Sequence, residues 1–260
     1  MPYAFVNGIN MYYEMEGEGF PLLALPGMGS SLEIWSPEYR NPLQAKYRLL
    51  LMDYRGIGRS DAPDIEYSVP MLARDIAELM TAVGIDRANI MGLSLGGMIA
   101  QELALTWPEK VEKLVLCATH CGTKHYIRLP EPKTTNKQEV EDVYADSIVA
   151  GMYPREFIEN NPAKIEDIIK RETIFPLPPE IFERHYQAAR SFDSYDRLEQ
   201  LKCPTLILTG DQDLMVNPEN SKMLAQFIPQ SKLEIIPGGG HGFLEQYPEL
   251  VLSLVMDFLG

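Results

Sequence analysis

The sequence Met91-Gly92-Leu93-Ser94-Leu95-Gly96-Gly97 carries a serine with a glycine two residues before it and another two residues after it. A short apolar run, 89–91, precedes it, and a helical pattern, 98–106, follows it. This G-x-S-x-G pattern between a strand and a helix is typical of a sharp turn that presents a nucleophilic serine. Glycines without Cβ atoms let neighbouring backbone pack against such a turn. The alternative is a glycine-rich turn in which Ser94 only caps the helix.

Short apolar runs on both sides of this turn predict a parallel sheet. They do not alternate polar and apolar residues, which is typical of strands buried on both faces by helices. The further runs are residues 21–25, 48–52, 113–117, 205–208 and 233–236. Asn7-Gly8 between two apolar stretches predicts an N-terminal β-hairpin, because both residues tolerate positive φ angles.

Helical periods separate these runs. Apolar residues at spacings of four and three predict a helix that Ser68 caps and Gly84 ends. Residues 98–106 predict a second helix, stopped by Trp107-Pro108, and residues 250–259 a third. The alternation of strands and helices predicts an α/β fold with right-handed crossovers, a mostly parallel sheet and helices on both of its faces.

Residues 122–201 interrupt this alternation, because they contain no convincing strand and several prolines. Three helical patterns fall there: Val140, Val143, Tyr144, Ile148 and Val149; Ile165, Ile168 and Ile169; and Phe182, His185, Tyr186 and Ala189. We expect residues 1–121 and 202–260 to form one α/β core. Residues 122–201 are then a helical cap over the carboxyl ends of the strands, where such folds bind ligands. A separate helical domain is the alternative.

Composition excludes several classes of function. The 260 residues have 45% hydrophobic and 23% charged residues, which argues against disorder. A net charge of −14 argues against a nucleic-acid partner. No apolar run is long enough for a membrane span, and we expect no signal peptide. Three cysteines argue against a disulfide framework, so we expect a cytoplasmic protein. The composition predicts no oligomeric state.

A serine nucleophile needs a base and a group that orients the base. His241 follows the last strand run in a glycine-rich loop, at the same predicted sheet edge as Ser94. His120 is its main rival, because it follows the run 113–117. Asp211 and Asp213 both follow the run 205–208, and the local sequence barely separates them. The order Ser, Asp, His is the one that α/β-hydrolases have.

The developing oxyanion needs two preorganised donors. One should be the N–H of Leu95, directly after the serine. The other should come from the loop after the run 21–25, and we expect the N–H of Met28. Gly27-Met28-Gly29 also resembles the start of a dinucleotide fingerprint, but Leu32 stands where the third glycine would be.

Cysteines and histidines cluster after the run 113–117, at Cys117, His120, Cys121 and His125. They could be read as zinc ligands, but Cys117 ends an apolar strand and is expected to be a buried thiol. We therefore expect neither a metal nor a cofactor.

Taken in order, the motifs resemble the α/β-hydrolase superfamily over essentially the whole chain. They are Pro26-Gly27-Met28-Gly29, Asp53-Tyr54-Arg55-Gly56-Ile57-Gly58-Arg59-Ser60, Gly92 to Gly97, Gly210 to Asp213, and Gly240-His241-Gly242. The chain looks like the single-cap group of enol-lactonases, carbon–carbon hydrolases, small carboxylesterases and cofactor-free haloperoxidases. In that group the acid is usually the last residue of G-x-x-D, which implies Asp213. Pro26-Gly27 differs from the usual His-Gly.

The resemblance implies a serine hydrolase of small apolar esters or lactones that works through an acyl-enzyme. Ser94 is the nucleophile, His241 the base and Asp213 the orienting acid, with the N–H groups of Met28 and Leu95 as oxyanion donors. Relatives that dehalogenate or open epoxides have aspartate at the turn, and dienelactone hydrolases have cysteine, so Ser94 argues against these reactions. Carbon–carbon cleavage, acyl transfer and perhydrolysis remain alternatives with the same triad, and so does a ligand-sensing receptor on this scaffold.

Overall fold

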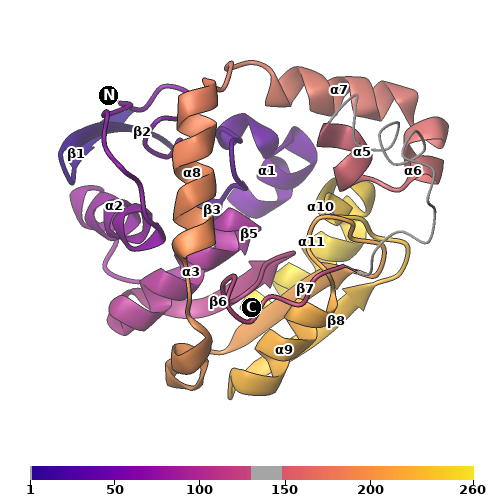
Figure 1. Cartoon of the computed structure of the whole chain (residues 1–260). Coiled ribbons are helices and arrows are strands. Elements are labelled where there is room, and N and C mark those ends of the chain that lie inside the picture. Colours follow the sequence, from indigo (N-terminus) through magenta and orange to yellow (C-terminus); the bar gives the residue numbers. More distant parts are fainter. Residues whose placement is uncertain (1, 130–147) are drawn as a thin grey trace.

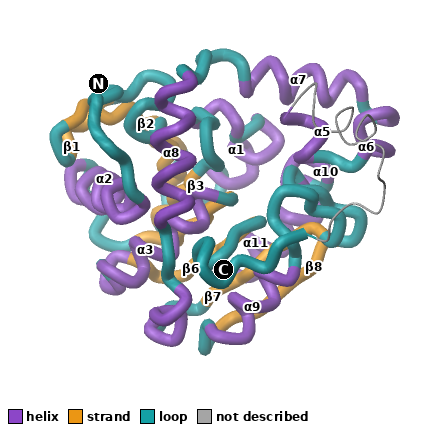
Figure 2. Tube along the Cα trace, in the orientation of Figure 1, coloured by secondary structure: helices purple, strands orange, loops and turns teal. Residues whose placement is uncertain are grey.

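An eight-stranded sheet forms the centre of the protein (Figures 1 and 2). The structure is a computed structural model and describes residues 2–129 and 148–260. The strands are β1 (Tyr3–Val6), β2 (Ile9–Glu16), β3 (Pro21–Leu25), β4 (Arg48–Met52), β5 (Ala88–Leu93), β6 (Val111–Cys117), β7 (Thr205–Gly210) and β8 (Ser231–Ile236). Their order is β1-β2-β4-β3-β5-β6-β7-β8. The β1–β2 and β2–β4 pairs are antiparallel, and all other pairs are parallel, as expected.

Helices lie between the strands in the chain and around them in space (Figure 2). They are α1 (Pro37–Gln44), α2 (Val69–Ala82), α3 (Leu95–Thr106), α5 (Ile148–Met152), α6 (Arg155–Asn160), α7 (Pro162–Glu172), α8 (Pro179–Ser191), α9 (Glu219–Phe227), α10 (Phe243–Gln246) and α11 (Pro248–Leu259). Short 3₁₀ turns span Leu32–Ile34, Pro108–Lys110 and Tyr195–Gln200. No helix of the described residues is both long enough and apolar enough to cross a membrane.

Both faces of the central part of the sheet are buried, which explains why its strands do not alternate polar and apolar residues. On β3, Leu23 and Leu25 belong to a core shared with α2, α3 and α9. Leu22 and Ala24 point to the opposite face and belong to a second core shared with α1 and α11. Each of the central strands β3, β4, β5, β6 and β7 therefore removes two apolar surfaces from water, and each buried leucine or isoleucine contributes about 1.5–3 kcal/mol.

Local signals in the sequence explain where several elements begin and end. The N-terminal hairpin turns at Asn7 and Gly8, whose φ angles are +42° and +81°, as its Asn-Gly pair predicts. Helix α2 begins after Ser68, whose hydroxyl accepts a hydrogen bond from the N–H of Met71. It ends before Gly84, which has a φ angle of +71°.

Some boundaries differ from those expected. Helix α3 begins at Leu95, three residues before the expected start, because the turn at Ser94 leads directly into the helix despite two glycines. Strand β8 begins at Ser231, two residues before the expected start, because Ser231 and Lys232 pair with Thr205 and Leu206 of β7 although neither is apolar. The helix expected around Val140–Val149 lies mostly outside the described residues, and α5 covers its end.

Helices α5 to α8 occupy the interval between β6 and β7, and α8 crosses in front of the sheet (Figure 1). Leu177, just before α8, packs against Gly29 in the loop after β3. Ile181 of α8 packs against Gly56 in the loop after β4. Because both loops follow the carboxyl ends of parallel strands, α8 lies over that edge of the sheet.

Candidate active site

Ser94 occupies a strained turn between β5 and α3. Its φ and ψ angles are +52° and −114°, a combination that costs a non-glycine residue about 1–3 kcal/mol. Its N–H donates to the carbonyl of Cys117 at 2.9 Å. Its carbonyl accepts from the N–H of Gly97 at 2.9 Å and from the hydroxyl of Thr119 at 2.7 Å. These bonds hold the serine in a conformation that it would not adopt alone.

The glycines around Ser94 are required by close backbone contacts. A Cβ atom on Gly92 would lie 2.3 Å from the carbonyl oxygen of Gly96. A Cβ atom on Gly96 would lie 2.3 Å from the carbonyl oxygen of Leu25, at the end of β3. The turn therefore packs against its own helix and against the neighbouring strand, which is the physical reason for G-x-S-x-G.

Asp213 and His241 form a buried pair, with side chains almost fully removed from solvent. Oδ1 of Asp213 accepts hydrogen bonds from the N–H groups of Met215 and Val216, both at 2.8 Å. Oδ2 lies 2.8 Å from Nδ1 of His241. A carboxylate can only accept, so Nδ1 of the histidine donates, and in the neutral imidazole Nε2 then keeps the lone pair. A histidine in this state can take a proton at Nε2.

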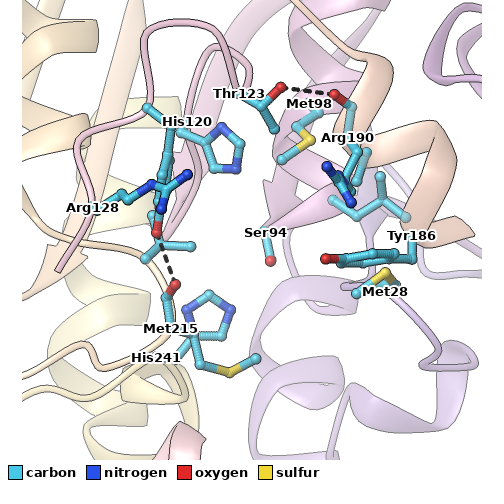
Figure 3. Close-up of a pocket in the computed structure, with 14 residues that line it drawn as sticks. Met28, Ser94, Met98, His120, Thr123, Arg128, Tyr186, Arg190, Met215 and His241 are labelled. Atoms are coloured by element: carbon cyan, nitrogen blue, oxygen red, sulfur yellow. Dashed lines mark hydrogen bonds between the residues drawn. The ribbon is translucent and has the colours of Figure 1, made fainter. Parts of the chain in front are cut away.

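Ser94 and His241 line one cavity of about 580 Å³ (Figure 3). Figure 3 shows the serine hydroxyl pointing toward the side of the cavity on which His241 lies. The two side chains form no direct hydrogen bond in the described part of the chain. Hydrogen bonds between a nucleophile and its base are often long without substrate and shorten when substrate binds.

The loop after β3 brings Met28 to the same cavity. Met28 and Leu95 both line it, and Leu95 is the first residue of α3. Among residues 2–129 and 148–260, neither N–H is bonded to a backbone carbonyl. Two polar contacts fix the loop: the hydroxyl of Tyr54 donates to the carbonyl of Pro26 at 3.1 Å, and Ser30 donates to Glu172 of α7 at 3.0 Å.

The family profile described as the alpha/beta hydrolase fold matches residues 21–179 and 182–248. The chain belongs to this family. Sequence relatives include the proposed carbamate hydrolase RutD of Azorhizobium caulinodans, 29% identical over all of this chain and 98% of its own. A poly(3-hydroxyalkanoate) depolymerase of Ectopseudomonas oleovorans is 30% identical over 92% of this chain and 84% of its own.

Among solved structures, the enol-lactonase of Burkholderia xenovorans superposes on this α/β-hydrolase with a TM-score of 0.85. The two are 26% identical, and the alignment covers 99% of both chains. Their similarity in both sequence and structure extends through the helices between β6 and β7, so the resemblance is not confined to the sheet.

The other histidines of this α/β-hydrolase have different surroundings. His120 lines the cavity, and its Nδ1 accepts from the N–H of Gly122 at 3.1 Å. Burial lowers the pKa of His120 to about 4. His185 is buried with Nε2 3.0 Å from the carbonyl of Arg55, and burial lowers its pKa as well. His125 stacks on Tyr195. Only His241 is paired with Asp213.

The hypothesis that Cys117, His120, Cys121 and His125 bind zinc is not supported by their positions. Within residues 2–129 and 148–260, no three histidine, cysteine, aspartate or glutamate side chains gather where they could hold a metal. Cys117 is fully buried at the end of β6, and burial raises the pKa of its thiol. It packs in the core as a small apolar residue would.

The motif from Asp53 to Ser60 has a structural role in this α/β-hydrolase. Asp53 is buried and accepts hydrogen bonds from the N–H groups of Leu32 and Arg59, at 2.8 and 3.0 Å. Arg55 is buried against Asp75 with two bonds of 2.6 Å. The Asp53–Leu32 bond joins the loop after β4 to the loop after β3, which carries Met28, and the Arg55–Asp75 pair joins the loop after β4 to α2.

Sequence reasoning missed several residues that line the cavity. They are Met98, Thr123, Tyr126, Arg128, Tyr186, Ala189, Arg190, Met215 and Val216. Tyr186, Ala189 and Arg190 lie three and four residues apart on α8, so one face of this helix meets the cavity. That spacing was the available signal, but the same pattern also fits a helix packed on the core.

Proposed function

We propose that the protein is a serine hydrolase of small carboxylic esters or lactones. Ser94 attacks the substrate carbonyl while His241 takes the hydroxyl proton at Nε2, and Asp213 holds the imidazole and stabilises its positive charge. The N–H groups of Met28 and Leu95 donate to the oxyanion of the tetrahedral intermediate. The intermediate then expels the alcohol, which receives the proton from His241.

A second half-reaction releases the acid. His241 takes a proton from water, the resulting nucleophile attacks the acyl-enzyme carbonyl, and the acyl–oxygen bond to Ser94 breaks. Ser94 recovers its proton from His241. Apart from substrate and water, every group in this cycle belongs to the chain, so the proposed reaction needs no cofactor.

The observation that carries the proposal is the buried Asp213–His241 pair beside the strained Ser94. Asp213 orients the imidazole of His241 through a 2.8 Å hydrogen bond. Ser94 lies at the tip of its turn with a φ angle of +52°. Keeping a non-glycine residue in this geometry costs free energy, and strain of this kind concentrates at functional sites. The named relatives, which include an enol-lactonase and a polyester depolymerase, agree with ester chemistry.

We also propose that residues 122–201 form the cap of this site. Leu177 and Ile181 pack on the loops after β3 and β4, and Tyr186 and Arg190 line the cavity. A cap so placed restricts the length of the substrate and shields the acyl-enzyme from bulk water. A cytoplasmic location stays a prediction from the sequence.

Carbamates are a second candidate substrate class, because a relative aligned over the whole chain is named for carbamate hydrolysis. The same nucleophile and donors can act on a carbamate carbonyl, and the product is then a carbamic acid. A panel of p-nitrophenyl esters, lactones and p-nitrophenyl carbamates, compared by kcat/KM, ranks the classes. Carbon–carbon cleavage, acyl transfer and perhydrolysis belong in the same panel.

A fluorophosphonate tests the proposed nucleophile directly. We expect one adduct per chain, seen as an increase in intact mass, and peptide mapping should place it on Ser94. The Ser94→Ala variant should take up no label and should lose about 10⁴-fold or more of its p-nitrophenyl acetate turnover. An adduct on another residue, or a Ser94→Ala variant that keeps most of its activity, would refute the proposal.

A further inference from the structure

Two arginines line the cavity that holds Ser94, and nothing in the proposed acyl-transfer steps uses them. Figure 3 shows Arg128 and Arg190 on opposite sides of the Ser94 hydroxyl. We propose that Arg128 and Arg190 form an anion-binding subsite, which selects esters or lactones that carry a carboxylate away from the reacting carbonyl. This inference rests on the proposed function and replaces the expectation of an apolar substrate.

Arg190 reaches the cavity from the last turn of α8. Tyr186 and Ala189 precede it on the same face of the helix and line the cavity too. The hydroxyl of Thr123 donates to the carbonyl of Arg190 at 2.8 Å, which ties the end of α8 to the segment after β6. The guanidinium lies 5.7 Å from the ring centre of Tyr186, a cation–π distance.

Arg128 belongs to a segment without regular secondary structure, but two asparagines fix its backbone. Asn220 is buried and bonds both the N–H and the carbonyl of Ile127, each at 2.9 Å. Asn217 donates to the carbonyl of Arg128 at 2.8 Å. These asparagines lie at the start of α9, so this end of the helix holds the segment in place beside the cavity.

The segment from His120 to Arg128 thus joins two distant parts of the fold. Thr123 binds the end of α8, and Ile127 and Arg128 bind the start of α9. Between these attachments, the hydroxyl of Tyr126 donates to the carbonyl of Met215 at 3.0 Å. His120 and Arg128, at the two ends of this segment, both line the cavity. The hydrogen bonds of the segment therefore fix the backbone that carries the positive charge of Arg128.

The charge of the cavity is opposite to that of the chain. The protein has a net charge of −14, with 37 acidic residues. None of the cavity-lining residues that the structure describes is an aspartate or a glutamate. His120 is neutral at pH 7, because burial lowers its pKa to about 4, so the positive charge comes from the arginines. The planar guanidinium binds carboxylates through paired hydrogen bonds.

A matched pair of substrates tests the subsite. Mono-p-nitrophenyl glutarate carries a carboxylate, and p-nitrophenyl glutaramate has a neutral amide of nearly the same shape in its place. We expect the wild-type protein to prefer the glutarate by about tenfold or more in kcat/KM, the usual size of a charge-assisted contact. The preference should fall about fivefold or more in Arg128→Gln and in Arg190→Gln, and should disappear in the double variant.

Arg74→Gln is the matched control, because it removes the same charge from an exposed site on α2 that does not line the cavity. Its preference should equal that of the wild type. The preference is a ratio measured on one sample, so partial unfolding of a variant does not alter it. A wild-type ratio near one, or a double variant that keeps the wild-type ratio, would overturn the subsite.

Binding to Ser94→Ala separates this inference from the proposed function. Calorimetric titration of that variant with both esters measures recognition without turnover. The glutarate should bind about tenfold or more tightly than the glutaramate, and Arg128→Gln with Arg190→Gln in the same background should abolish the difference. Equal affinities would reject the subsite even if labelling identifies Ser94. A clear difference would support it even if labelling fails.

Discussion

Asp211 and Asp213 lie two residues apart after β7, yet their contacts differ. Asp211 is exposed and accepts a hydrogen bond from the N–H of Gly238 at 2.7 Å. Asp213 is 2% exposed and binds Nδ1 of His241. The first contact stabilises a turn, and the second selects the imidazole tautomer that the proposed base needs.

The two aspartates give a matched test of this difference. Asp213→Asn should lower kcat/KM for p-nitrophenyl acetate by about 10³–10⁴-fold, because an amide no longer selects the same tautomer or stabilises the imidazolium. Asp211→Asn keeps an oxygen acceptor for Gly238, so it should change the value by less than about threefold. Pre-steady-state acylation rates of both variants check the prediction. Equal losses, or a larger loss from Asp211→Asn, would reject Asp213 as the acid.

The local sequence could not decide between these aspartates, because both follow the same buried strand. The backbone after β7 distinguishes them, because the N–H groups of Met215 and Val216 donate to Oδ1 of Asp213 and leave Oδ2 for His241. This arrangement depends on the chain direction after β7, which the residue types do not specify. Resemblance to the family implied Asp213, whereas spacing alone left both open.

At the scale of elements, the join between β5 and α3 has almost no free space. Gly92, in β5, lies against the backbone of Gly96 and Gly97, and Gly96 lies against the carbonyl of Leu25. These neighbours are backbone atoms of a central strand and a buried helix, so they cannot move aside as a flexible side chain can. The position of Ser94 is therefore fixed by the packing of two elements.

Gly92→Ala should consequently destabilise the protein by about 2 kcal/mol or more, since overpacking at a rigid site has this size. Gly151→Ala is the comparison, because a Cβ atom in α5 would meet only Met215, at an ordinary distance of 3.7 Å. It should be neutral or stabilising by up to about 1 kcal/mol. Urea unfolding of both variants measures the free energies, and a Gly92→Ala protein as stable as Gly151→Ala would contradict the packing argument.

The elements that the sequence predicted best are the strands with a continuous apolar run. Strands β3 and β4 match their apolar runs residue for residue, because every residue after the half-buried Pro21 and Arg48 is buried. Helix α7 buries the expected Ile165 and Ile168 but exposes Ile169. Helix α8 buries the expected His185 but exposes Phe182 and Tyr186, so its buried face was predicted only in part. Helices α1 and α9 were not predicted, since Pro42 interrupts the first and polar residues fill much of the second.

At the scale of the whole molecule, the order of the strands could not be read from the chain. Strand β3 lies between β4 and β5, although β4 follows it in sequence. This crossover places the loop of Met28 beside the turn of Ser94. Arg128 and Arg190 likewise come to line one cavity, because the segment after β6 is attached both to the end of α8 and to the start of α9. The family resemblance predicted that the loop of Met28 lies beside Ser94, but no motif in the sequence indicated that Arg128 and Arg190 line the same cavity.

Buried titratable groups make the stability of the whole molecule depend on pH in two opposite directions. Burial lowers the pKa of His120 and of His185, so the unfolded chain binds protons that the folded chain does not. These histidines therefore reduce stability as pH falls. Burial raises the pKa of Asp53 and of Glu172, so protonation of these carboxyls favours the folded state as pH falls.

His120→Asn isolates one of these contributions. The asparagine oxygen can replace Nδ1 as the acceptor for the N–H of Gly122, but it does not titrate. The ordinary histidine pKa is about 6.5 and that of His120 is about 4, so the wild type should lose about 3 kcal/mol from this group as pH falls across that interval. The unfolding free energy of the His120→Asn variant should therefore fall by about 3 kcal/mol less than that of the wild type over the same pH interval. The carboxyl and His185 contributions cancel in the comparison, because both proteins contain them.

Urea unfolding at half-unit steps from pH 7.5 to pH 4 measures this difference. The difference in unfolding free energy between the two proteins should be constant above pH 7. Below pH 6, where the unfolded wild type takes up its extra proton, it should shift in favour of the variant, by about 3 kcal/mol at pH 4. Since His241 and Asp213 are unchanged, the variant should also keep its label uptake at Ser94. Curves that stay parallel down to pH 4 would mean that His120 titrates alike in both states, and its burial beside the cavity would then carry no proton linkage.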